Sequence, residues 1–176
     1  MFKPGSSEEA ELCQPDLASS WERMRAALGK GVRLARSWRS PRMHLIRRDG
    51  RRRYVEVDAP WFSSSGLVLR PRAVDALAEL LESDGELLRL RCDEAELFLW
   101  HVTRCLPALD DAKSRGFRFE DGRWGRVEKY VWKPRVVGDH AAFRISGDDA
   151  HAIYVTDRFV RAWTKAGLTG LVFRPT

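Results

Sequence analysis

Apolar and polar residues in the middle of the chain alternate in a way that predicts a strand, a helix and a second strand. The first strand is the apolar run at 67–69, and Pro71 suits the first turn of a helix. One apolar helical face follows at a spacing of three and four residues, formed by Val74, Leu77 and Leu81. The turn Asp84-Gly85 then leads to a second strand-like run at 87–90.

The same order returns near the C-terminus. A strand at 153–155 precedes Thr156, a good helix N-cap, and Gly167 ends the helix before another strand at 171–173. Aligning Leu69 with Val155 superimposes the apolar helical positions of the two segments. We therefore predict an internal strand-helix-strand pseudo-repeat.

Between the two copies, the sequence predicts mostly strands. The apolar run from Leu97 to Leu109 suits a buried strand or a buried helix, and Val102 and Thr103 favour the strand. Further strands are predicted at 117–119, 127–132 and 142–145, separated by turns at Asp121-Gly122, Lys133-Pro134 and Gly138-Asp139. The predicted fold class is α+β, a mixed sheet with a few short helices.

The first 60 residues predict a different organisation. Residues 1–18 are rich in Pro, Gly, Ser and Glu and predict a flexible arm. A capping box at Ser19 and Glu22 begins a helix that Gly29 ends, alternation at 32–38 predicts a half-buried strand, and Asp49-Gly50 predicts a hairpin turn. The expected division is a flexible N-terminal arm at 1–18, a basic helix and strand segment at 19–60, and an α+β domain at 61–176.

The net charge of +6 over 176 residues is concentrated in one place. Residues 23–53 hold twelve basic side chains and one acid, whereas residues 54–176 are nearly neutral. The basic excess is therefore a property of one surface. The three cysteines form no CxxC pair, and the sequence has neither a secretory leader nor a membrane-spanning apolar run, so we expect a cytoplasmic protein.

No set of residues predicts enzyme chemistry. The four histidines, His44, His101, His140 and His151, lack the spacing of a helical zinc site, and His101 in an apolar run is expected to be a hydrogen-bonded core residue. Gly29-Lys30-Gly31 lacks the rest of a phosphate-binding loop. We expect no catalytic residues, no metal and no cofactor.

Two features predict binding. The arginines around the Asp49-Gly50 turn suit phosphates or carboxylates, and they are Arg47, Arg48, Arg51, Arg52 and Arg53. Alternatively, they form a solvated hairpin tip that pairs with the acidic stretch 56–96. In the second feature, Tyr130 and Trp132 share a core face, while Trp124 beside a glycine turn, with Arg126, is the better candidate for an exposed anchor.

Several segments resemble one bacterial family. They are FLWHVTRCLPALDDAKS at 98–114, VEKYVWKP at 127–134, AAFRI at 141–145, IYVTDRFVRAWTKAGLTGLVFRP at 153–175 and, less specifically, GLVLRPRAVDALAEL at 66–80. Together they resemble the polymorphic-toxin immunity proteins of immunity family eleven, a former domain of unknown function, over about residues 61–176. Arg70 departs from the Ser or Thr cap expected in the first copy of the repeated unit.

The resemblance implies a cytoplasmic, non-enzymatic protein that binds a cognate bacterial toxin and occludes its active site or substrate access. It implies core and turn roles for the motif residues Leu109, Asp110, Phe143, Gly167, Gly170 and Phe173. The alternative from a different class is a nucleic-acid-binding protein that uses residues 23–53, whose affinity would fall steeply with salt.

Overall fold

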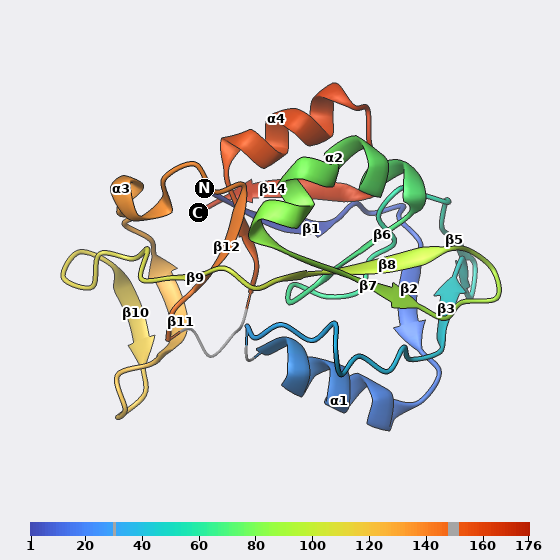
Figure 1. Cartoon of the computed structure of the whole chain (residues 1–176), viewed down its shortest axis with the longest axis horizontal. Coiled ribbons are helices and arrows are strands. Elements are labelled where there is room, and N and C mark those ends of the chain that lie inside the picture. The colour runs from blue at the N-terminus through green and yellow to red at the C-terminus, as the bar shows by residue number, and fades with distance from the viewer. Residues whose placement is uncertain (30, 148–151) are drawn as a thin grey trace.

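The computed structural model describes residues 1–29, 31–147 and 152–176. Within them it shows a mixed α/β fold with four helices and several sheets, the largest having five strands (Figure 1). The helices are α1 (Ala18–Gly29), α2 (Pro71–Asp84), α3 (Pro134–Val137) and α4 (Asp157–Lys165). None of these helices has the length and apolar character needed to cross a membrane.

A three-stranded sheet confirms the strands and helix predicted at 67–90. Its order is β6-β8-β7, formed by β6 (Leu67–Leu69), β8 (Leu97–Val102) and β7 (Gly85–Leu90), and both outer strands run antiparallel to β8. Pro71 stands in the first turn of α2, as predicted. The run from Leu97 is a strand, which agrees with the preference indicated by Val102.

The five-stranded sheet has the order β14-β1-β13-β12-β9. Its members are β14 (Leu171–Pro175), β1 (Phe2–Ser6), β13 (Tyr154–Val155), β12 (Ala142–Ile145) and β9 (Cys105–Leu106). The sheet is mixed because β12 and β9 are parallel while the other pairs are antiparallel.

The prediction of a flexible arm at 1–18 is wrong. Strand β1 lies inside the five-stranded sheet, paired with β14 from Phe2 opposite Pro175 to Ser6 opposite Leu171. Residues Leu12–Pro15 form β2, which pairs with β3 (Met43–Ile46). These pairings join residues that are distant along the chain, so local composition gave no sign of them.

In each of the two predicted strand-helix-strand units, the two strands lie on either side of a third strand that is antiparallel to both. Strands β6 and β7 flank β8, and strands β13 and β14 flank β1. Helix α2 connects the first pair and helix α4 the second, and the two helices pack against each other. The elements match the prediction, while a repeat relationship between them stays a prediction.

The three-stranded sheet is buried on both faces. Leu67, Trp100 and Val102 point to the side of α2 and α4, whereas Val68 and Leu99 point to the side of α1. A third cluster, which includes Phe143 and Tyr154, also contains Trp124, with Val127 packed against it. Strands covered on both faces are apolar at nearly every position, which explains why periodicity alone could not separate strand from helix at 97–102.

The segment at 19–60 contains the predicted helix but not the predicted strand. Helix α1 begins at Ala18, so Ser19, the predicted cap residue, lies inside the helix. No strand forms at 32–38, because the buried Glu86 carboxylate accepts hydrogen bonds from the backbone N–H groups of Leu34 and Ala35, and Ser37 N–H turns back to the Leu34 carbonyl. The donors that a strand would use are thereby engaged.

The hairpin at Asp49-Gly50 is present. Strands β4 (Arg48–Asp49) and β5 (Arg52–Arg53) pair in antiparallel fashion, and Gly50 has φ 56°. That left-handed conformation suits glycine, which has no Cβ to clash. The paired part of the hairpin is short, with two residues in each strand.

Candidate partner-binding surfaces

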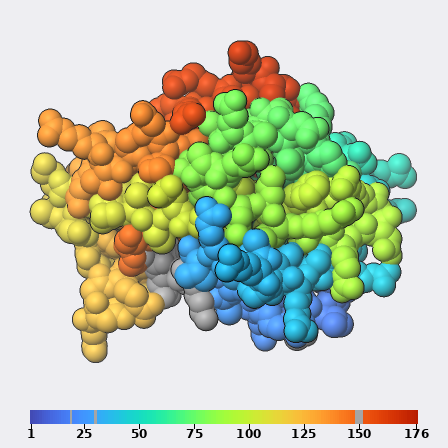
Figure 2. All heavy atoms as spheres, viewed as in Figure 1, coloured from blue at the N-terminus to red at the C-terminus, as the bar shows by residue number. Residues whose placement is uncertain are grey.

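A two-stranded hairpin stands apart from the main sheets. It consists of β10 (Arg115–Arg118) and β11 (Trp124–Lys129), joined by the predicted turn at Asp121-Gly122. In Figures 1 and 2 this hairpin, coloured yellow to orange, projects at one end of the molecule. All four residues of β10 are exposed to solvent.

The outer face of this hairpin carries two exposed aromatic rings. Phe117 is 57% exposed and Phe119 is 38% exposed, and their rings meet edge to face with centroids 5.1 Å apart. Both rings pack over Gly125 of β11: a Cβ at that position would lie 2.6 Å from Cδ1 of Phe117 and 2.9 Å from Cε2 of Phe119. The glycine therefore provides the space in which the pair assembles.

Trp124 occupies the opposite face of the hairpin, and the prediction that it is an exposed anchor is wrong. Its side chain is buried in the cluster that includes Phe143, and the Arg118 guanidinium covers the ring with Cζ 3.5 Å from the ring centroid. Arg118 also donates to Asp111 at 2.6 Å, and this hydrogen bond lowers the pKa of the Asp111 carboxyl. Trp124, which follows the turn glycine Gly122, thus points inward and packs the hairpin against the rest of the protein.

Basic side chains surround the exposed rings. The Arg123 guanidinium lies 5.4 Å from the centre of the Phe119 ring and donates to Asp121 at 2.6 Å. Arg126, a predicted contact residue, is exposed on β11 opposite Phe117. Tyr130 and Trp132 are half-buried and stacked on each other, which confirms their predicted inward orientation. The sequence prediction missed the exposure of Phe117 and Phe119, for which the glycine opposite the two aromatics, Gly125, was the available signal.

The five arginines predicted as a binding stripe have different surroundings. Arg47 binds the fully buried Glu11 at 2.7 Å, and Arg70 binds the other carboxylate oxygen of Glu11 at 2.6 Å. This hydrogen bond to Glu11 raises the pKa of Arg47. Glu56 and Glu94 lie within 3.4 and 3.6 Å of the Arg47 guanidinium, so for this residue the predicted pairing with the acidic stretch is confirmed.

The other four arginines lie on the β4–β5 hairpin and are exposed. Arg48 donates to the Gly50 carbonyl at 3.2 Å, and Arg52 donates to the Glu8 carbonyl at 2.5 Å. Within the described part of the chain, Arg51 and Arg53 contact no carboxylate. Of the five predicted arginines, Arg47 thus belongs to an ion-pair network with the buried Glu11, and the other four form a charged hairpin tip.

Arg70 occupies the N-cap position of α2, where the resemblance led us to expect Ser or Thr. Its side chain makes no capping hydrogen bond, and its guanidinium instead donates to the Val57 carbonyl at 2.9 Å and to Glu11. The side chain that replaces a capping hydroxyl is therefore part of the buried ion-pair network.

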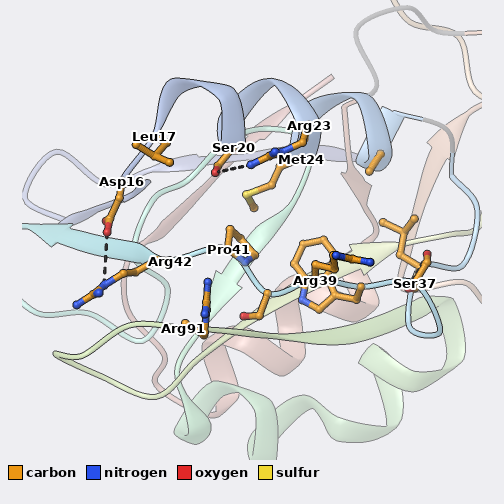
Figure 3. A pocket seen from close by; sticks show the side chains of 14 residues that line it. Asp16, Leu17, Ser20, Arg23, Met24, Ser37, Arg39, Pro41, Arg42 and Arg91 are labelled. Atoms are coloured by element: carbon orange, nitrogen blue, oxygen red, sulfur yellow. Dashed lines mark hydrogen bonds and ion pairs between the residues drawn. The ribbon is translucent and has the colours of Figure 1, made fainter.

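A pocket of about 670 Å³ lies between α1 and the segment 34–42 (Figure 3). Met24 of the helix and Pro41 of the opposite segment point into the space between them. Four arginines line this pocket, Arg23, Arg39, Arg42 and Arg91, together with one acid, Asp16. Sequence reasoning identified the basic segment but not this hollow, which depends on how α1 packs.

The described residues show no cluster suited to metal binding, although the buried Asp84 carboxylate lies 2.6 Å from Nδ1 of His140. No group of three His, Cys, Asp or Glu side chains gathers among them. His101 is a buried core residue, as predicted, with its Nε2 2.9 Å from the Val32 carbonyl; burial lowers its pKa. His151 lies outside the described residues.

Exposed aromatic and arginine side chains on a packed scaffold are typical of a protein that binds another protein. Residues 91–176 match the model of an immunity protein family, Imm11. The resemblance seen in the sequence is thereby confirmed for the C-terminal half; residues 61–90 lie outside the match. No individual curated protein matches the chain.

The resemblance implied core and turn roles for the family motif, and the structure agrees with this for several of its members. Leu109 and Phe143 are buried, and Asp110 accepts hydrogen bonds from the N–H groups of Ala112 and Lys113 in a turn. Gly170 has φ 104°, and a Cβ there would lie 2.5 Å from the Ala59 carbonyl oxygen. These motif residues support the fold.

Proposed function

We propose that the chain is a cytoplasmic immunity protein that binds a cognate bacterial toxin domain and neutralises it by occluding the active site or substrate access. We further propose that the β10–β11 hairpin makes the main contact and that the protein carries out no chemistry of its own. The match to the immunity family supports the toxin as partner. The observation that carries the contact surface is the exposed pair Phe117 and Phe119.

The physical argument for the hairpin rests on what stabilises protein interfaces. A few aromatic and arginine side chains supply most of the binding energy, and charged neighbours steer the approach of the partner. The Phe pair offers apolar area that is already ordered by its packing over Gly125, so little conformational freedom is lost on binding. The surrounding arginines predict an acidic patch on the toxin.

The test is to express the toxin domain encoded beside this gene and to measure its binding by calorimetry. Replacing both phenylalanines, Phe117→Ser and Phe119→Ser, should weaken binding at least about 30-fold, as expected for hot-spot residues worth 2 kcal/mol or more. Protection of cells from the toxin should fall in parallel. The matched control is Val55→Ser, because Val55 is also an exposed apolar residue, 52% exposed, on another surface.

Both substitutions remove solvent-exposed side chains, so the thermal transition should stay within a few degrees of the parent protein. Unchanged toxin affinity in the double variant would refute the hairpin contact. Failure of the parent protein to bind or neutralise the toxin would refute the proposed function itself.

The alternative is a nucleic-acid-binding protein, and the exposed arginines of the β4–β5 hairpin support it. Phosphate binding by several arginines would give an affinity that falls steeply with salt. A mobility-shift titration with duplex DNA and with RNA at low salt decides the question: no shift excludes this alternative, whereas a shift abolished by Arg51→Glu and Arg53→Glu supports it.

A further inference from the structure

We propose that the pocket between α1 and residues 34–42 binds an acidic segment of a protein partner, whose apolar side chain enters the space beside Met24 and whose carboxylates bind the surrounding arginines. The proposal is separate from the hairpin contact, because it concerns another surface and another ligand chemistry. Except for Arg91, the pocket residues lie outside the part of the chain that matches the family.

The first observation is an excess of positive charge that the pocket does not neutralise. Its only acid, Asp16, is held by Arg42 at 3.5 Å and by His44 at 3.1 Å. Among the described residues, the guanidinium groups of Arg39 and Arg91 bind no carboxylate, and Arg23 contacts only the Ser20 hydroxyl, at 3.2 Å. Three guanidinium groups therefore face one hollow without a counter-ion from the chain.

The second observation is apolar surface inside the same hollow. Leu17 at its edge is 61% exposed, the highest value among the exposed large apolar side chains of the described chain. Met24, Leu34 and Trp38 extend this apolar lining inward. A volume of about 670 Å³ is within the usual range of ligand sites, roughly 300–1,000 Å³. The ligand that fits is thus an anion with an apolar body.

The third observation favours a peptide over a compact anion. Trp38 and Ser40 are fixed because both side chains donate to the Arg89 carbonyl, at 2.8 and 2.7 Å. Arg39 lies between these two anchors, and within the described chain neither its backbone N–H nor its carbonyl has a hydrogen-bond partner. A held segment with free backbone groups can bind the backbone of a second chain, and carboxylates on that chain can reach the arginines.

The probe is a synthetic seven-residue peptide of alternating Glu and Leu that begins and ends in Glu, titrated into the full chain by calorimetry. Two control peptides replace every Glu by Gln or every Leu by Ser, and each should bind at least tenfold more weakly. The charge-reversal variant Arg39→Glu with Arg91→Glu should also lose at least tenfold. The matched control is Arg51→Glu with Arg53→Glu, which reverses two equally unpaired, exposed arginines elsewhere and should change affinity less than threefold.

A second variant, Leu17→Ser, tests the apolar contribution without changing charge, and it should weaken the peptide at least threefold because Leu17 is exposed and its loss leaves the fold intact. No binding of the Glu-Leu peptide, or equal binding by both charge-reversal variants, overturns the proposal. Inorganic phosphate and a dT oligonucleotide complete the test: if either displaces the peptide at the same concentration, the pocket recognises phosphate and the acidic segment is not its ligand.

Discussion

Replacing Arg47 should destabilise the protein although this arginine stands at the edge of a charged, solvent-facing stripe. In Arg47→Met the fully buried Glu11 carboxylate loses a hydrogen bond of 2.7 Å and keeps those from Arg70, at 2.6 Å, and from the Val57 N–H, at 3.5 Å. Breaking a wholly buried ion pair costs about 3–5 kcal/mol. Because the Arg47 side chain is 40% exposed and Arg70 remains, we expect a smaller loss, about 2 kcal/mol of unfolding free energy.

The assay is urea unfolding followed by circular dichroism, with Arg51→Met as the matched control. Arg51 undergoes the same chemical change on the neighbouring hairpin, but it contacts no carboxylate in the described structure, so its loss should stay within about 0.5 kcal/mol. A double-mutant cycle with Glu11→Gln isolates the pair, since residues in direct contact show non-additive effects. Equal stability of the two Met variants, or strict additivity in the cycle, would refute the reasoning.

Three further outcomes follow from the contacts described. Burial lowers the pKa of His101 below its ordinary 6.5, so the unfolded chain binds the His101 proton more tightly than the folded chain does. The free energy of unfolding should therefore fall as the pH drops below 6.5, by up to about 1.4 kcal/mol per pH unit. Urea unfolding between pH 7.5 and 5 should show this slope, and His101→Gln should reduce it. Burial alone would raise the pKa of Asp58, but hydrogen bonds from Thr169 and Arg72 outweigh burial, and the pKa lies below 3.8. The contribution of Asp58 to folding stability is therefore complete above pH 3.8 and is lost as the pH falls below that value. Thr169→Val should raise the pKa of Asp58 measured by NMR titration. Gly125→Val should displace both phenylalanine rings and weaken toxin binding at least tenfold while the thermal transition moves only a few degrees; an unchanged affinity would show that the order of the pair is unimportant.

The local elements were predictable because their signals are local. Residues 67–90 combine an apolar run, Pro71 and a helical face, and each signal points to the same structure. Residues 2–6 carry no such signal, because their strand depends on pairing with β14 and β13, more than a hundred residues away in the sequence. The strand predicted at 32–38 failed for a related reason, since one distant carboxylate, Glu86, binds the backbone donors.

The candidate site shows the same division at the level of side chains. Alternation along a hairpin separates its two faces, but the sequence does not say which face meets the body. Trp124 turns inward because Arg118 covers its ring while binding Asp111, and Phe117 and Phe119 then face outward. The burial of Trp124 in the cluster that includes Phe143, together with the covering Arg118 guanidinium, therefore leaves Phe117 and Phe119 exposed on the other face of the hairpin.

The role of each arginine in the basic segment depends on whether its guanidinium group is paired with a carboxylate. Within the basic segment, Arg42 and Arg47 are neutralised by nearby carboxylates and contribute to the fold. Arg39 beside the α1 pocket and Arg51 on the β4–β5 hairpin have the same charge but no carboxylate within the described chain, so their field acts on solvent and on an approaching partner. Binding by this segment should therefore depend on which arginines are unpaired, whereas the total of its positive charge should predict little.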